Sequence, residues 1–229
     1  MNILAFDTCF DSCSACVAEQ RGGVVIELAE TFERFQTGHA QRLIPMVGEV
    51  LQLARMSFDQ IDRIAVTAGP GTFTGTRIGI AAARAFALAC GAKTVGVSSL
   101  VAMAEAARTQ VTAEALAVVV DARRGEFYAQ LFGPGGGLDA KTPPQVLSIE
   151  DAARQGSGPI VFVGSGAAAV AAAVREGRDA LAALPDLLPD AGALARIAAG
   201  LEASEAPLVP LYLRPPDAKP QVGQAIARA

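Results

Sequence analysis

The sequence predicts an α/β protein of two duplicated lobes, each with a mixed sheet and crossover helices. Strand-like and helix-like apolar segments alternate along the first half of the chain, which indicates parallel strands joined by helices. Residues 2–7 and 116–121 are both short apolar runs that end in aspartate and lead through a turn into another strand-like segment. The recurrence of this order in both halves indicates a duplication.

The first lobe opens with three predicted strands. Residues 2–7 form an apolar run, typical of a buried strand, that ends in the polar pair Asp7-Thr8. A turn at residues 10–12 leads to strands at 14–19 and 24–31, which Arg21-Gly22-Gly23 joins as a hairpin turn. We therefore predict an antiparallel meander.

Two helices and two further strands complete the first lobe. Between residues 39 and 56 apolar side chains recur at helical spacing, which predicts a helix. Residues 63–68 and 94–97 are predicted strands, and 76–90 is a predicted helix between them. The resulting order βββαβαβ combines an antiparallel edge with parallel strands.

The second lobe repeats the strand pattern after a linking helix at residues 98–108, which Ser98 or Ser99 caps. Strands are predicted at 116–121, 126–132 and 160–163, with a tight turn at 123–125. We place the lobe boundary at residue 98, so that residues 1–98 form the lobe with the partner interface and residues 99–229 the smaller lobe. The last segment, about 208–229, is a candidate to pack back on the first lobe.

Composition and net charge restrict the classes of function that the sequence allows. A chain of 229 residues that is 52% hydrophobic is expected to be globular. Its net charge of −4 argues against a free-standing nucleic-acid-binding protein, since such proteins neutralise phosphates with a basic surface. The sequence has no run of about 20 apolar residues that could span a membrane. We therefore expect a cytoplasmic protein.

The four cysteines are too few for a disulfide framework and are expected to be reduced thiols. Cys9, Cys13 and Cys16 have the spacing of the iron–sulfur ligands in radical S-adenosylmethionine enzymes. A strand that begins near Cys13, however, sends Cys13 and Cys16 to opposite faces. Buried packing is the preferred interpretation, and we expect no metal site.

A glycine-rich turn lies between the strand at 63–68 and the helix at 76–90. Backbone N–H groups at a helix N-terminus suit a phosphate or carboxylate. The turn matches neither the P-loop nor the dinucleotide fingerprint. A purely structural role is the alternative: Pro70 and Gly71 make the turn, Thr72 or Thr74 caps the helix, and Gly79 permits close packing.

Asp7 and Asp121 occupy equivalent strand ends. Two such acids facing one cleft hold magnesium and nucleotide phosphates in actin-like and sugar-kinase-like ATPases, which have the ASKHA or ribonuclease H-like fold. The alternative is that each aspartate caps its own turn. Arg123, Arg124 and Glu126 make a poor phosphate cradle. The candidate nucleotide- or anion-binding residues are Asp7, Thr8, Gly69, Gly71, Thr72, Thr74, Gly75, Asp121, Gly164 and Gly166.

The helix at 76–90 is apolar around its whole circumference, apart from Arg77 and Arg84. Such a helix is normally covered on all sides, whereas one lobe covers one face. A second subunit that packs on both first-lobe helices would supply the cover, and residues 208–213 of the chain itself are the competing cover. The candidate partner-interface residues are His39, Arg42, Leu43, Met46, Val47, Arg77, Ile78, Ile80, Ala81 and Arg84.

Six motifs together resemble the TsaB (YeaZ) family over nearly the whole chain. They are FDT at 6–8, HAQRLIPMV at 39–47, GPGTFTGTRIG at 69–79, GVSSL at 96–100, DARRGEFY at 121–128 and YLR at 212–214. Each motif alone is moderately specific, but their order and spacing together are specific. The resemblance also agrees with the actin-like fold of two lobes.

The resemblance implies a helper rather than a catalyst. TsaB-like proteins pair with a catalytic TsaD-type subunit through the two first-lobe helices. With a TsaE-type ATPase they support the transfer of a threonylcarbamoyl group to adenosine 37 of tRNA, so that tRNA is reached only through the complex. Alone, they form homodimers through the same surface. No cofactor is required, and ATP or ADP with magnesium binds weakly or only with the partner.

Protease activity is not expected, because His39 is the single histidine and would have to serve every candidate nucleophile. TsaD-type proteins hold a metal with a pair of histidines, which one imidazole cannot replace. His39 is instead expected at the interface or as a cap. The alternative function is an actin-like ATPase or small-molecule kinase that uses Asp7 and Asp121.

Overall fold

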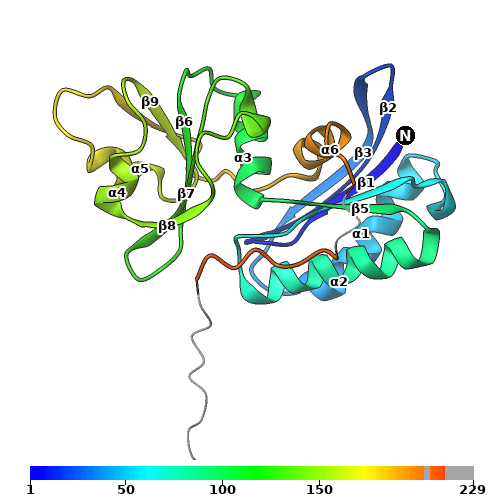
Figure 1. Cartoon of the computed structure of the whole chain (residues 1–229). Helices are drawn as coiled ribbons and strands as arrows, with labels where there is room; N and C mark the ends of the chain where they lie inside the picture. The colour runs from blue at the N-terminus through cyan, green and yellow to red at the C-terminus, as the bar shows by residue number, and fades with distance from the viewer. Residues whose placement is uncertain (204–206, 215–229) are drawn as a thin grey trace, which may run out of the picture.

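The computed structural model describes residues 1–203 and 207–214 and contains two five-stranded sheets (Figure 1). The first has the order β3-β2-β1-β4-β5, and the second has the order β10-β9-β6-β7-β8. In the first sheet β1, β2 and β3 are antiparallel, while β1, β4 and β5 are parallel. The second sheet repeats this arrangement with β6 in the place of β1. The predicted duplication is confirmed.

The strands of the first sheet are β1 (Asn2–Asp7), β2 (Ser12–Arg21), β3 (Val24–Arg34), β4 (Arg63–Thr67) and β5 (Lys93–Val97). Those of the second are β6 (Leu116–Asp121), β7 (Glu126–Phe132), β8 (Gln145–Ser148), β9 (Ile160–Val163) and β10 (Ala180–Ala183). The predicted meander is confirmed, although β2 begins two residues earlier than expected.

The helices are α1 (His39–Leu53), α2 (Phe73–Cys90), α3 (Ser99–Arg108), α4 (Ile149–Ala153), α5 (Ala167–Ala172) and α6 (Ala191–Ala199), with short 3₁₀ turns at Phe58–Gln60 and Gly136–Leu138. Helices α1 and α2 cover one face of the first sheet and α6 covers the other (Figure 1). Ser98 caps α3, as one of the two predicted caps. Helix α2 begins three residues earlier than predicted, because Thr72 is its cap.

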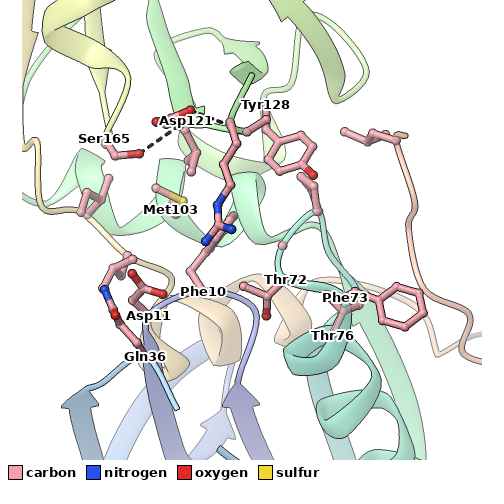
Figure 2. Close-up of a pocket in the computed structure, with 18 of the residues that line it drawn as sticks. Phe10, Asp11, Gln36, Thr72, Phe73, Thr76, Met103, Asp121, Tyr128 and Ser165 are labelled. Carbon is pink, nitrogen blue, oxygen red and sulfur yellow. Dashed lines mark hydrogen bonds between the residues drawn. The ribbon is translucent and has the colours of Figure 1, made fainter. Parts of the chain in front are cut away.

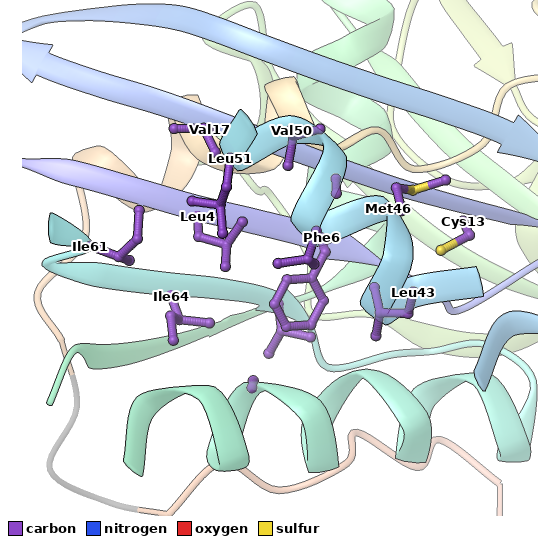
Figure 3. Packing of buried hydrophobic residues seen from close by; sticks show 14 residues of the cluster. Leu4, Phe6, Cys13, Val17, Leu43, Met46, Val50, Leu51, Ile61 and Ile64 are labelled. Carbon is purple, nitrogen blue, oxygen red and sulfur yellow. The ribbon is translucent and has the colours of Figure 1, made fainter. Parts of the chain in front are cut away.

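The core of the first lobe lies between the sheet and α1 and α2 (Figure 3). Phe6 is at its centre, with its ring edge-on to Phe86 at 5.9 Å between centroids. Aromatic pairs prefer this geometry. Cys13 belongs to this cluster and Cys16 to the cluster on the α6 side, so the two thiols point to opposite faces as predicted. Burial raises the pKa of both thiols.

Helix α6 was not predicted and changes how the chain divides. It belongs to the half of the chain that we expected in the second lobe, yet its apolar side packs on β1 and β2 of the first sheet. Burying Ile3 and Ala5 under Leu194 and Ala195 completes the second face of that sheet. Strands β8 and β10 and helix α4 were also missed. No helix within the described residues is long and apolar enough to cross a membrane.

Candidate functional site

A cleft with a cavity of about 990 Å³ separates the two lobes. Its first-lobe wall includes residues 34–36, the turn after β1, the turn before α2 and the first turn of α2. Its second-lobe wall includes Met103, the β6–β7 turn, Tyr128, Ser165 and residues 185–188. Figure 2 shows the side chains that line it, with Phe10, Asp11, Thr72 and Thr76 opposite Asp121, Tyr128 and Ser165. The cleft is therefore where a ligand of both lobes would bind.

The glycine turn before α2 is held by the end of β1. The Thr72 amide donates to the Cys9 carbonyl at 2.6 Å, and the Thr8 hydroxyl donates to the Gly75 carbonyl at 2.8 Å. A Cβ on Gly71 would lie 2.4 Å from the Cys9 carbonyl oxygen, and one on Gly75 would lie 1.9 Å from that of Thr8. These two glycines permit the chain segments to touch, so the sequence feature that suggested an anion site has a packing cause.

The rest of the turn has equally local partners. The Gly75 amide donates to the Thr72 hydroxyl at 3.1 Å, which satisfies one of the N–H groups at the start of α2. Gly69 has φ of 105°, and a Cβ there would lie 2.9 Å from the Leu211 carbonyl oxygen. Thr74 is exposed on the first turn of α2. Of the predicted turn residues, Gly71 and Thr72 line the cleft.

Asp7 does not line the cleft, contrary to the prediction that Asp7 and Asp121 face one site. Its side chain is fully buried. One carboxyl oxygen accepts from the Thr67 hydroxyl and, at 3.2 Å, from the Cys9 amide. Burial raises its pKa to about 7, against the lowering effect of these hydrogen bonds. The structure therefore does not bring the two aspartates together as a pair that could hold magnesium.

Asp121 lines the cleft but also stabilises its own turn. Its carboxylate accepts from the Arg123 amide at 2.7 Å, and its amide donates to the Ser165 hydroxyl at 3.0 Å (Figure 2). Gly164 and Gly166 pack against other segments of the second lobe. A Cβ on Gly164 would lie 2.6 Å from the Val119 carbonyl oxygen, and a Cβ on Gly166 would lie 2.5 Å from the Phe127 ring. The turn-capping alternative thus describes Asp121.

Arginines give the cleft its positive groups. Arg34 donates to the Asp186 carbonyl at 2.7 Å, and Arg77 donates to the Tyr212 hydroxyl at 2.7 Å. Arg123 also lines the cavity, and its side chain makes no hydrogen bond to a described residue. Within the described part of the chain, no three His, Cys, Asp or Glu side chains are grouped to hold a metal ion.

The predicted partner face on α1 and α2 needs correction. Leu43, Met46 and Val47 are buried in the core under the first sheet, and Ile80 of α2 is also buried. These side chains are not available to a partner. The same apolar stripe that identified α1 as a helix is the stripe that packs on the sheet.

The polar residues predicted for the partner face have partners within the chain. The His39 ring is buried beside Phe35, and its Nε2 lies 2.8 Å from the Phe10 carbonyl oxygen. Arg42 binds Glu33 and Glu49. Ile78 is partly buried against the core. Arg77 and Arg84 are exposed and bind residues 207–214, which cover one flank of α2.

An apolar surface nevertheless remains on the outward sides of α1 and α2. Leu88 is 88% exposed and Ile44 is 63% exposed. On each helix an exposed residue one turn away is small, Gly48 beside Ile44 and Ala85 beside Leu88, which lets another helix approach closely. We call this surface the outward face, and its residues are Ile44, Pro45, Gly48, Ala81, Ala85, Leu88 and Ala89. Of the predicted interface residues, Ala81 belongs to it; a helical projection rotated away from the core stripe would have found the others.

Comparisons with known proteins agree over nearly the whole chain. A family model described as TsaD, tRNA N6-adenosine threonylcarbamoyltransferase, matches residues 13–207. The chain is 34% identical to the tRNA threonylcarbamoyladenosine biosynthesis protein TsaB of Escherichia coli, with 93% of this chain and 95% of that protein covered. An uncharacterized protein of Mycobacterium tuberculosis is 36% identical, with coverages of 95% and 94%.

Solved structures give the same result. YeaZ from Pseudomonas aeruginosa matches with a TM-score of 0.77 at 30% identity, covering 93% of this chain and 99% of that chain. Together with the two sheets of equal topology, this match confirms the actin-like fold of duplicated lobes. The chain belongs to the TsaB (YeaZ) family of tRNA threonylcarbamoyladenosine biosynthesis proteins.

Proposed function

We propose that this protein is an accessory subunit in tRNA threonylcarbamoyladenosine biosynthesis and that it binds a TsaD-type catalytic subunit through the outward face of α1 and α2. The observation that carries the proposal is the exposure of Leu88 and Ile44 among small residues on two adjacent helices. Exposed large apolar side chains on adjacent helices are typical of an interaction site. The name of the E. coli relative supplies the pathway.

A helper role agrees with the chemistry of the cleft. Asp7 is buried with a raised pKa, so it is a poor ligand for magnesium. Asp121 is engaged in its own turn. The single histidine is buried against Phe35 and the Phe10 carbonyl. None of these groups is placed to activate a nucleophile in the cleft.

The same proposal covers the other partners. ATP or ADP with magnesium is not required by this subunit and binds its cleft weakly or only when the partner is present. A TsaE-type ATPase is a further partner in the complex. The tRNA is reached only through the complex, because this chain has a net charge of −4. Without a partner, a second copy covers the outward face and forms a homodimer.

The decisive experiment places a charge on the outward face. In Ala81→Glu or Leu88→Glu, partner binding requires burying an unpaired carboxylate, which costs several kcal/mol. We expect at least tenfold weaker binding of a TsaD-type subunit in calorimetry, and loss of the homodimer in light scattering. Ala169→Glu, at an exposed alanine on α5 of the other lobe, is the matched control. Unchanged affinity in both face variants, with normal melting curves, refutes the interface.

The enzyme alternative is tested on the purified chain alone. A helper predicts negligible ATP turnover with or without substitution at Asp121, whose side chain is the acidic group of the predicted pair that reaches the cleft. Rapid turnover without any partner, abolished in Asp121→Asn, would establish the ATPase instead. A TsaD-type subunit is then added to ask whether turnover belongs to the complex.

A further inference from the structure

Residues 207–214 form an extended segment that touches both lobes, and we call it the strap. In Figure 1 it is the red-orange segment that runs alongside α2 toward the second lobe. Four of its residues, 211–214, line the inter-lobe cavity. The strap is therefore one wall of the cleft as well as a link between the lobes.

The first half of the strap is anchored firmly on the first lobe. The Leu211 amide donates to the Ala68 carbonyl at 2.7 Å, which extends the backbone pairing beyond β4. Leu208 packs against the first-lobe core, and Arg84 donates to its carbonyl. These contacts combine apolar burial with backbone hydrogen bonds, so this half is expected to stay in place.

An aromatic stack holds the middle of the strap. The Tyr212 ring stacks on Phe73 at 5.8 Å between centroids, with 22° between the ring planes. The Arg77 guanidinium lies 3.5 Å from the Phe73 centroid and donates to the Tyr212 hydroxyl. The Arg77 side chain therefore makes both a cation–π contact with Phe73 and a hydrogen bond with Tyr212. Phe73 and Arg77 belong to the first turns of α2, and Tyr212 belongs to the strap.

Among the described residues, the Arg214 side chain makes the hydrogen bonds between the strap and the second lobe. Arg214 donates to the Ala122 carbonyl at 3.1 Å and pairs with the Glu126 carboxylate, both at the β6–β7 turn. Side-chain exposures of 21% for Arg214 and 45% for Glu126 leave this pair open to solvent. An ion pair of this kind is weak and is screened by salt.

We propose that the strap is a latch whose Arg214 end sets how far the two lobes open. Its first-lobe half stays anchored through Leu211 and Tyr212, whereas the contact of Arg214 with the β6–β7 turn closes and opens. Closing narrows the cleft between the β6–β7 turn and α2. Release lets the second lobe rotate about its remaining connections, which are the chain crossings near Ser99 and before α6 and the hydrogen bond from Arg34 to the Asp186 carbonyl. The inference is independent of the partner proposed above, because it concerns one chain alone.

The test measures the separation of the lobes in the isolated full-length chain. Spin labels are placed at Lys93→Cys and Glu150→Cys, which are exposed positions in opposite lobes, with the partly exposed Cys90 replaced by serine. Labelled protein is diluted with unlabelled protein so that only distances within one chain are read. In Arg214→Ala the distance distribution should broaden and move to longer distances than in the parent. Glu126→Gln should shift it in the same direction.

Arg154→Ala is the matched control, since it removes an exposed arginine–aspartate pair that lies wholly within the second lobe. Its distribution should equal that of the parent. Hydrogen exchange of the Leu211 amide should remain slow in Arg214→Ala, because the anchored half stays bound. An unchanged distance distribution in Arg214→Ala overturns the latch, and so does an equal shift in Arg154→Ala.

Discussion

At the scale of single residues, Asp7 shows how one position can look catalytic and be structural. The sequence places it at the end of a buried strand, where an actin-like ATPase carries a magnesium-binding acid. In the structure, Thr67 and Cys9 occupy one carboxyl oxygen, and the other has no hydrogen-bond partner among the described residues. Burying a charge in such a place is costly, which is why its pKa is raised.

This raised pKa predicts how stability depends on pH. Burial raises the pKa of Asp7 from 3.8 to about 7, so between these values the folded chain holds a proton that the unfolded chain releases. The Asp7 contribution to stability therefore falls as pH rises from about 4 to about 7 and is constant above that. Asp7→Asn keeps the accepting oxygen but cannot ionise. Between pH 4 and pH 8 the wild type should lose on the order of 2–4 kcal/mol more than the variant in urea unfolding.

Asp11→Asn is the control for this measurement, since Asp11 is an exposed carboxylate near the same strand end. It should leave the pH dependence of unfolding as in wild type. If Asp7→Asn and wild type lose stability in parallel across this range, Asp7 is not the group that titrates.

Gly75 and Gly48 allow the effect of close packing on stability to be distinguished from the effect of helix propensity. At Gly75 a Cβ would lie 1.9 Å from the Thr8 carbonyl oxygen and 2.6 Å from the Thr72 hydroxyl, whereas at Gly48 nothing lies within 4 Å. Gly75→Ala should therefore destabilise the protein by about 2–4 kcal/mol. Gly48→Ala should be neutral or stabilise by up to about 1 kcal/mol, because alanine favours the helix. Chemical unfolding of both variants checks the contrast, and equal effects contradict it.

At the scale of elements, α2 shows why an all-round apolar helix need not be buried by one neighbour. Its Gly79 and Ala83 side packs on the first sheet, and the strap covers the flank that carries Arg77 and Arg84. The side with Leu88 remains exposed. The sequence suggested two segments that could cover α2. The chain's own C-terminal segment lies on one flank of the helix, and the proposed partner would bind another.

The end of α1 offers a test of helix termination. Arg55 follows the C-cap Ala54 and has φ of 53°, a left-handed conformation that glycine adopts without strain. Arg55→Gly should raise the free energy of unfolding by about 0.5–1 kcal/mol. Arg55→Ala removes the same side chain but keeps the Cβ, so it should give no such gain. Equal stability of the glycine and alanine variants would show that backbone strain is not the cause.

At the scale of the whole molecule, the sequence predicts the duplication because β1 and β6 are both apolar runs that end in aspartate. It does not predict β10 or α6. The β10 sequence is Ala-Leu-Ala-Ala, with no β-branched residue to indicate a strand, and the alanine-rich α6 is only nine residues long.

In the candidate site, the features that depend on neighbours in sequence were predicted, and those that depend on distant contacts were not. Helix caps and tight turns depend on neighbours in sequence, so Thr72, Ser98 and the β6–β7 turn were found. The buried Asp7 carboxyl accepts a hydrogen bond from Thr67, which is distant in sequence. A polar residue at the end of a strand gives the same sequence pattern whether its side chain faces a cleft or a second strand. The sequence therefore did not show that Asp7 lies outside the cleft, and this is why the predicted acid pair was wrong.

The return of α6 to the first sheet has a consequence for folding. Without it, Ile3, Ala5 and Val95 on that face of the sheet would be exposed to water. A fragment of residues 1–98 should therefore fail to fold cooperatively and should aggregate, although it contains all five strands of its sheet.

A second fragment makes this prediction specific. Fusing residues 186–203, which include α6, to the end of residues 1–98 through a flexible glycine–serine linker should restore a cooperative thermal transition. In the fused fragment, Leu194→Asp should abolish that transition again, because the fully buried Leu194 side chain lies in the restored core. Circular dichroism melts and size-exclusion chromatography measure both effects. A cooperative melt of residues 1–98 alone would mean that α1 and α2 suffice to stabilise the first sheet, and that α6 only joins the two lobes.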